Sequence, residues 1–339
     1  MDFTPQIAPG TPVLVTGATG FTGSLLVRRL VEAGVRVRAL ARPSSSTEHL
    51  KDLEIEWFTG HIYEPDTVNA AVDGTAYIFH LAAVYRQTNI PDELFHRIHV
   101  EGTKCVAEAA RRNTALQRLV HVSTIGVHGH VRNPPADEQA PFNPDDRYQA
   151  TKAEAEQWVR AYATEHGVPH TILRPCAIYG PGDTRLLKVF RMASRRYCPI
   201  LGQRDCHYHL IHVEDLVRVI LLAATRPAAL NEVFIAGNPE SVTMERMIRI
   251  IAGALNHSVR IIRLPAWPFF AVAVVCETVC RPLGIEPPIH RRRVAFYTKT
   301  RDFDTRKLRH TLQYEMQYTN EEGLAETARW YADHGMLRV

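Results

Sequence analysis

The amino-acid sequence predicts an α/β fold, in which a doubly wound parallel sheet is followed along the chain by a smaller α+β part. Three features of the 339 residues predict it. The first is a short apolar run that is followed by a glycine-rich turn and a helix. The second is the alternation of short apolar strands with helices after this unit, and the third is the end of that alternation near residue 180. Right-handed crossovers place such helices on both faces of one sheet. We therefore expect a sheet domain at residues 1–180 and, at 181–339, a lid packed on it with some exchange of chain.

The first predicted unit is a strand, a glycine-rich turn and a helix. Residues 13–15 form an apolar, β-branched run that is typical of a strand buried on both faces. Gly17, Gly20 and Gly23 come next, and residues 24–33 read as a helix that Gly34 ends. Glycines let the backbone turn tightly and approach a pyrophosphate, which binds the free amide groups of the helix start. This order predicts a dinucleotide site, with an ordinary strand-to-helix turn as the alternative.

The remaining elements are predicted from apolar periodicity and from the Gly and Pro positions between them. In the first part, strands are expected at 35–41, 55–58, 76–81, 119–123 and 170–173, and helices at 65–72, 93–112 and 148–165. Beyond residue 180, helices are expected at 186–194, 213–224 and 244–255, and strands at 210–213 and 233–236. The most apolar segment, 266–280, is too short to span a bilayer. We expect it to be a buried or substrate-covering helix, with a membrane-dipping helix as the alternative.

Composition excludes several classes of function. A net charge of +4 and the lack of basic runs interleaved with aromatic residues argue against nucleic-acid binding. The only dense basic cluster, residues 291–293, is read as a solvated face, with an anion or weak membrane-surface contact as the alternative. The six cysteines lack metal-ligand spacing, so no metal site is expected. The first ten residues do not resemble a signal peptide, and we expect a cytoplasmic protein without a transmembrane span.

Tyr148 and Lys152 are the residues best suited to proton transfer. They lie four positions apart at the start of a predicted helix and so project from one face. A neighbouring ammonium stabilises a phenolate and lowers the phenol pKa from its usual value near ~10, which allows proton exchange with a substrate hydroxyl. Such a pair also occurs by chance on solvated helices. Ser123 and Thr124, at the end of a predicted strand, provide hydroxyls that could hold the substrate oxygen.

Several motifs occur together in a fixed order: TGATGFTG at 16–23, HLAA at 80–83, VSTIGVHG at 122–129, YQATK at 148–152, RPCAIYGPGD at 174–183 and HVEDL at 212–216. With them the chain resembles the extended short-chain dehydrogenases/reductases, the NAD-dependent epimerase/dehydratase superfamily, over most of its length. The resemblance implies a Rossmann fold and is closest to the branch of 3β-hydroxysteroid dehydrogenases and dihydroflavonol reductases.

The resemblance also implies residue roles. Tyr148 would be the general acid/base, Lys152 would lower its pKa and bind the nicotinamide ribose, and Thr124 would bind the reacting oxygen. The implied cofactor-binding residues are Gly17, Thr19, Gly20, Phe21, Thr22, Gly23, Arg42, His61, Ile62, Leu81, Ala82, Ala83, Ser123, Tyr148, Lys152, Pro175 and Ile178. Tyr85, Thr124 and Tyr208 are the candidate substrate contacts. Two positions depart from the family pattern: His61 stands where an Asp is frequent, and His99 stands in place of an Asn.

Arg42 bears on the choice of cofactor. Sites that prefer NAD place a carboxylate at the end of the second strand, where this chain has Ala41 and then Arg42. A guanidinium there can bind a 2′-phosphate. We therefore expect NADP(H) to be preferred; if Arg42 only stacks on adenine, NAD(H) binds as well.

The substrate class rests on what the family's sugar-nucleotide members have and this chain lacks. Those members place an arginine before the HVEDL-like segment and an Arg-x-Gly-Asp element further on. Here the segment at 206–211 is rich in aromatic and imidazole groups, Arg204 is out of register, and residues 291–294 read RRRV. We expect a secondary alcohol or ketone on a largely apolar substrate, with a nucleotide-sugar epimerase or dehydratase as the alternative and a non-catalytic dinucleotide binder as the third. Family analogy predicts a homodimer.

Overall fold

The computed structural model describes residues 6–84, 91–202, 206–280, 287–288, 291, 294 and 298–337. The candidate substrate contact Tyr85 and the out-of-register Arg204 lie outside these residues, as do Arg292 and Arg293 of the basic cluster.

The centre of the molecule is one seven-stranded sheet in the order β11-β6-β5-β4-β1-β2-β3, in which all pairs are parallel. Its strands are β1 (Pro12–Thr16), β2 (Arg36–Ala41), β3 (Ile55–Thr59), β4 (Tyr77–His80), β5 (Arg118–Val122), β6 (His170–Pro175) and β11 (Val233–Ala236). β4, β6 and β11 are buried along their whole length, as expected for strands of a parallel sheet that is covered on both faces. The predicted doubly wound sheet is confirmed.

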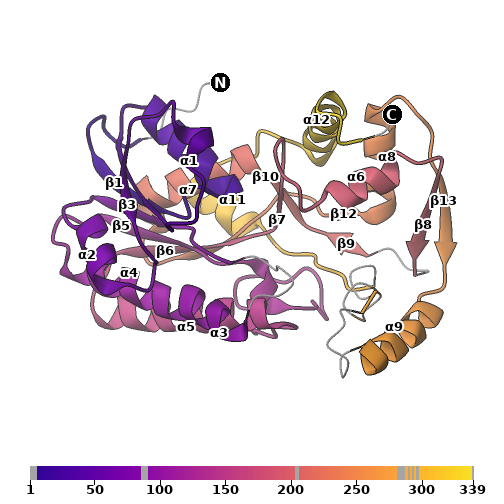
Figure 1. Ribbon diagram of the computed structural model, residues 1–339, viewed down its shortest axis with the longest axis horizontal. Coiled ribbons are helices and arrows are strands. Elements are labelled where there is room, and N and C mark those ends of the chain that lie inside the picture. The colour runs from indigo at the N-terminus through magenta and orange to yellow at the C-terminus, as the bar shows by residue number, and fades with distance from the viewer. Residues whose placement is uncertain are drawn as a thin grey trace.

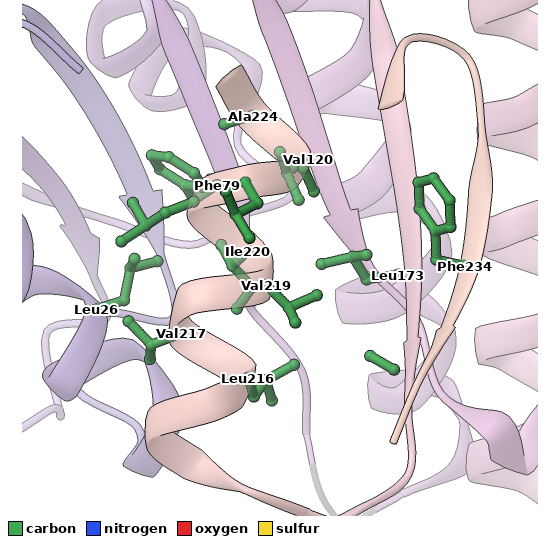
Figure 2. Packing of buried hydrophobic residues seen from close by; sticks show 14 of the residues in the cluster. Leu26, Phe79, Val120, Leu173, Leu216, Val217, Val219, Ile220, Ala224 and Phe234 are labelled. Atoms are coloured by element: carbon green, nitrogen blue, oxygen red, sulfur yellow. The ribbon is translucent and has the colours of Figure 1, made fainter. Parts of the chain in front are cut away.

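Helices cover both faces of this sheet (Figure 1). One face carries α1 (Phe21–Glu32), α7 (Val213–Thr225) and α11 (Arg306–Leu312), and the other α2 (Pro65–Val72), α3 (Asp92–His96), α4 (Gly102–Arg112) and α5 (Arg147–Glu165). Figure 2 shows α7 against the first face, where Leu216 and Ile220 belong to one buried cluster with Phe79 and Val120 of the strands. The segment expected as one helix at 93–112 is α3, a π-helical turn at Arg97–Glu101 and α4.

The later part of the chain forms a smaller α+β unit with its own core. Its helices are α6 (Leu187–Ala193), α8 (Met244–Ala254) and α12 (Asn320–Asp333). Its strands form three two-stranded pairs: β7 (Ala177–Tyr179) with β10 (Leu210–His212), β9 (His207–Tyr208) with β12 (Val242–Thr243), and β8 (Tyr197–Leu201) with β13 (Arg260–Leu264). Strand β11 and helices α7 and α11, from beyond residue 180, also belong to the central sheet and its helical layers.

The apolar segment 266–280 is the main correction to the predicted fold. It forms helix α9 (Trp267–Cys280), but only Ala273 and Glu277 in it are buried, and Trp267 is 74% exposed. The expectation that this helix is buried is therefore wrong. It does not cover the substrate site either, because no α9 residue is among the described residues that line the cavities of the candidate active site, which are described below. Apolar composition predicted burial, whereas most side chains of α9 are partly or largely exposed.

Candidate active site

The glycine turn packs so closely against neighbouring backbone that only glycine fits at two of its positions. Gly17 has φ +73°, and a Cβ there would lie 2.9 Å from the Ala82 nitrogen, while a Cβ on Gly23 would lie 2.1 Å from the Gly17 oxygen. Gly20 precedes α1 with no side chain capping the helix start, so amide groups of the first turn point outward. α1 begins at Phe21, three residues earlier than predicted, which places Phe21, Thr22 and Gly23 in that first turn. The turn has the form of a phosphate-binding helix start.

Two adjoining cavities meet at Gly17 and Gly20, at the carboxyl ends of the central strands, where open α/β sheets bind ligands. We name them the catalytic cavity, of about 360 Å³, and the β2 cavity, of about 180 Å³. Of the predicted site residues, the catalytic cavity is lined by Gly17, Gly20, Phe21, Thr22, Gly23, Leu81, Ala83, Ser123, Thr124, Tyr148, Lys152, Pro175, Ile178 and Tyr208. The β2 cavity adds Thr19, Arg42, His61, Ile62 and Ala82. Every predicted site residue except Tyr85 thus lines one of the two cavities.

Tyr148 and Lys152 extend from the first turns of α5. The helix start is fixed by Asp146, whose carboxylate accepts a hydrogen bond from the Gln149 amide at 2.9 Å. The buried Lys152 Nζ donates to the Val122 carbonyl at 2.7 Å. Burial lowers the pKa of Lys152 to about 8, against the opposing effect of the Glu156 carboxylate. At neutral pH the ammonium therefore remains the main form, on the same helix face as the phenol.

Thr124 lies beside this pair at the end of β5. Its Oγ1 accepts a hydrogen bond from the Gly126 amide at 3.1 Å, which caps a short 3₁₀ turn at Ile125–His128. Because that bond uses the oxygen as an acceptor, the hydroxyl proton can still be donated to a ligand. Thr124 and Tyr148 together supply two O–H groups to the catalytic cavity.

A buried ion pair lies behind the catalytic cavity. Arg174 at the end of β6 donates to Glu156 of α5 at 2.6 Å, and both side chains are fully buried. Ser123 Oγ donates to the second oxygen of the same carboxylate at 2.6 Å. The hydroxyl of Ser123, one of the implied cofactor-binding residues, is therefore bonded to Glu156. No motif in the sequence indicated this pair, although Glu156 continues the helical spacing of Tyr148 and Lys152 on one face.

His99, which replaces the family's Asn, connects the loop after strand β4 to α5. Its Nε2 accepts from the Val84 amide at 3.0 Å, so Nδ1 carries the proton and donates to Thr151 Oγ1 at 2.8 Å. Its ring meets the Tyr148 ring edge-on, with centroids 5.4 Å apart. Burial, together with the Lys152 charge, lowers the pKa of His99 to about 3, so the ring is neutral at physiological pH. It lies in the π-helical turn, which no sequence pattern indicated.

The β2 cavity has a cationic rather than an acidic lining. The exposed Arg42 comes directly after β2, and Ser45 is beside it. None of the described lining residues of this cavity is Asp or Glu. His61, in place of the family's Asp, stacks on Tyr63 with ring centroids 5.0 Å apart, and its amide donates to Glu64 at 2.9 Å.

The remaining wall of the catalytic cavity is mixed. Apolar side chains from the turn after β5, from the start of α6 and from α7 line it, together with two arginines that the sequence analysis did not assign to the site. Arg185 is bonded to Asp183 at 2.6 Å, with its guanidinium 5.4 Å from the Phe21 ring centroid. Arg301 also lines the cavity, and its amide donates to the His207 carbonyl at 2.8 Å.

The family model described as the NAD dependent epimerase/dehydratase family matches residues 13–237, which include the glycine turn, both cavities' predicted cofactor residues and the Tyr148–Lys152 pair. The chain belongs to this family. This member of the epimerase/dehydratase family, an extended short-chain dehydrogenase/reductase, is an NAD(P)-dependent enzyme, and the predicted resemblance is confirmed.

Curated relatives of this family member agree with that assignment. A putative dihydroflavonol 4-reductase of Synechocystis is 30% identical, with both chains covered completely. A ceramide reductase of Caulobacter vibrioides is 33% identical over 75% of this chain and 73% of the relative. A 3-beta-hydroxysteroid dehydrogenase of Mycolicibacterium neoaurum is 29% identical over 95% of this chain and 91% of the relative. The crystal structure of gox2253 matches with a TM-score of 0.81 and 27% identity, covering 97% of this chain and all of the other.

The described residues have two further properties. None of their helices is both long and apolar enough to cross a membrane. Within the same residues, no group of three or more His, Cys, Asp or Glu side chains is arranged to hold a metal ion.

Proposed function

We propose that this enzyme is an NADP(H)-dependent oxidoreductase that interconverts a secondary alcohol and a ketone on a largely apolar, sterol-, flavonoid-, lipid- or polyketide-like substrate. The observation that carries the proposal is the shared cavity of Tyr148, Lys152 and Thr124, whose wall continues into the side chains of Ile125 and Leu216. Proton-transfer groups and an apolar wall in one cavity suit a carbonyl on a hydrophobic framework.

The residues present fit a dinucleotide. Side chains at Gly17 and Gly23 would collide with neighbouring backbone and displace the turn, and the amide groups at the start of α1 suit a pyrophosphate. Leu81 and Ala83 on one side and Pro175 and Ile178 on the other would line the cofactor. When bound, the nicotinamide supplies or accepts the hydride.

The protein's own groups handle the proton. In reduction, the hydroxyls of Thr124 and Tyr148 donate hydrogen bonds to the substrate carbonyl, and the Tyr148 proton passes to the oxygen as it becomes an alcohol. The Lys152 ammonium, fixed by the Val122 carbonyl, stabilises the phenolate that remains. In oxidation the same phenolate accepts the hydroxyl proton.

Two observations support the cofactor and substrate class. Arg42 at the end of β2 offers a cation where NAD-preferring sites place a carboxylate, which favours a 2′-phosphate. The relatives include a ceramide reductase and a 3-beta-hydroxysteroid dehydrogenase, whose names denote apolar substrates.

A second candidate function is a nucleotide-sugar epimerase or dehydratase with tightly bound NAD. Arg185 and Arg301 in the wall of the catalytic cavity favour it, because two guanidinium groups could bind a sugar-nucleotide diphosphate. The two functions differ in whether the cofactor leaves after each turnover.

The test is a titration of the purified protein with NADPH and with NADH, monitored by nicotinamide fluorescence. Arg42→Ala should weaken NADPH binding by about 10–150-fold, the loss expected for one charged hydrogen bond, and change NADH binding less than about threefold. Arg36→Ala, at the other end of β2 and also exposed, is the matched control and should change neither. The NADP(H) proposal is contradicted if Arg42→Ala weakens the binding of both cofactors equally. It is also contradicted if the wild type binds NADH more tightly than NADPH. Protein purified with NAD bound favours the epimerase alternative.

A further inference from the structure

Exposed apolar side chains gather on one part of the molecule. Of the large hydrophobic residues that the described chain exposes, all but Leu230 lie on β8, β13 and α9. They are Tyr197, Ile262, Trp267, Val272, Val274, Val275 and Val279, which we call the apolar edge. Figure 1 shows these three elements at the end of the C-terminal part that is remote from the seven-stranded sheet. β8 pairs with β13, and α9 follows β13 in the chain, and exposed apolar side chains gathered on such neighbouring elements mark an interaction site.

Helix α9 faces water with its valines and turns its charge inward. Val275 is 62% exposed, whereas Glu277, its only charged residue, is 6% exposed. The Glu277 carboxylate accepts hydrogen bonds from the Arg291 amide at 2.7 Å and from Arg291 Nε at 3.0 Å. A helix adapted to water would show the opposite distribution.

The β8–β13 pair presents a second apolar strip beside basic groups. Tyr197 pairs with Arg260 in parallel register, and Ile262 lies two positions further along, so the three share one face of the pair. Cys198 and Ile200 point to the other face and join the core of the C-terminal part. The outward face therefore carries Tyr197, Arg260 and Ile262.

The segments that carry the apolar edge are mainly basic, although Arg263 is paired with Glu245 of α8 at 2.6 Å. Residues 195–201 and 260–280 contain four arginines and a single acidic residue, the inward Glu277. Arg195, Arg196 and Arg260 are exposed and form no ion pair within the described residues. A symmetric dimer through this face would bring like charges together, whereas an anionic lipid surface complements both the arginines and the apolar side chains.

We propose that the apolar edge docks this enzyme on the surface of an anionic lipid bilayer. α9 has 14 residues and is about 21 Å long, shorter than the ~30 Å hydrocarbon core, so it lies in the plane of the interface rather than across it. Trp267 at its start suits the headgroup level, where indoles concentrate. The inference does not depend on which substrate the catalytic cavity takes.

The test is sedimentation of the full chain with vesicles of phosphatidylcholine alone or with added phosphatidylglycerol, without any measurement of turnover. Wild-type protein should sediment with the anionic vesicles and less with the neutral ones. Replacing Arg195 and Arg196 by Gln should lower the partition coefficient by about 25-fold, since each arginine near such a surface contributes about fivefold. Val275→Asp should lower it at least as much, because a carboxylate would enter the apolar interface.

Leu230→Asp is the matched control, since Leu230 is 45% exposed but lies away from the apolar edge, and it should bind vesicles as the wild type does. Circular dichroism of each variant checks that it is folded. Wild-type protein that stays in the supernatant with anionic vesicles overturns the proposal, as does Val275→Asp binding them unchanged. A Val275-dependent dimer in light scattering, without vesicle binding, overturns it in favour of a second copy of the chain.

Discussion

Glu156→Gln should destabilise the protein strongly although the side chains are nearly equal in size. The substitution leaves the buried Arg174 guanidinium without a counter-charge and weakens the acceptor of Ser123 Oγ. Removing one member of a buried pair costs about 3–5 kcal/mol of unfolding free energy. An unfolding entropy of about 2.1 cal/mol/K per residue amounts to roughly 0.7 kcal/mol/K for this chain, so Tm should fall by about 4–7 °C in scanning calorimetry.

Glu154→Gln on the same helix is the control for the loss of one carboxylate. Glu154 is 53% exposed, and within the described residues its ion pair is with the partly exposed His96, so its loss should change stability by less than about 0.5 kcal/mol. Glu156 also raises the pKa of Lys152, and in Glu156→Gln the alkaline loss of activity should move to lower pH. A difference of less than about 1 °C between the two variants would refute the reasoning.

Three other substitutions test the site. Tyr148→Phe should reduce turnover by about 10²–10⁴-fold with cofactor binding retained, and an active variant would exclude Tyr148 as the acid/base. His99→Asn should make the stability of the protein less sensitive to acid. The pKa of His99 is near 3 in the folded chain and 6.5 in the unfolded chain, so falling pH favours the unfolded chain. Between about pH 7 and about pH 5 the unfolding free energy of the wild type, measured in urea, should therefore fall by about 2 kcal/mol more than that of the variant. Unfolding free energies that fall equally with pH in the wild type and the variant would contradict this. Gly17→Ala should abolish tight NADPH binding, whereas Gly10→Ala, also at positive φ but with no atom within 4 Å, should lose only about 1 kcal/mol of stability.

The sequence predicted those parts of the site that are formed by residues close together in the chain. The strand β1, the turn at Gly17 and the helix α1 are adjacent in the chain, and the loops after the parallel strands all lie at the carboxyl edge of the sheet. The helical spacing of Tyr148 and Lys152 put both side chains on one face, and both line the catalytic cavity with Thr124. Their roles, like the oligomeric state and the compartment, stay predictions.

Partners distant in the chain were not predictable in this way. The Glu156–Arg174 pair joins a helix to a strand end, and β8 pairs with β13 more than fifty residues later. Both strands contain residues that interrupt the apolar pattern expected of a strand: β8 contains a proline and β13 contains arginines. For α9, hydropathy measures what a segment contains and not what surrounds it, so an exposed apolar helix looks like a buried one.

The path of the chain through β11 has a consequence for evolution and engineering. β11 forms the outer strand beside β6, and α7 covers the sheet next to β5, although both come from beyond residue 180. A fragment ending at residue 180 would lack that strand and helix, leaving the β6 edge and an apolar sheet face open to association with other chains. The cofactor half is thus not a transferable module. Grafting a different substrate half onto it would have to preserve residues 213–236 and helix α11 as part of the recipient, so new specificities in this architecture arise by changing the segments between the shared elements.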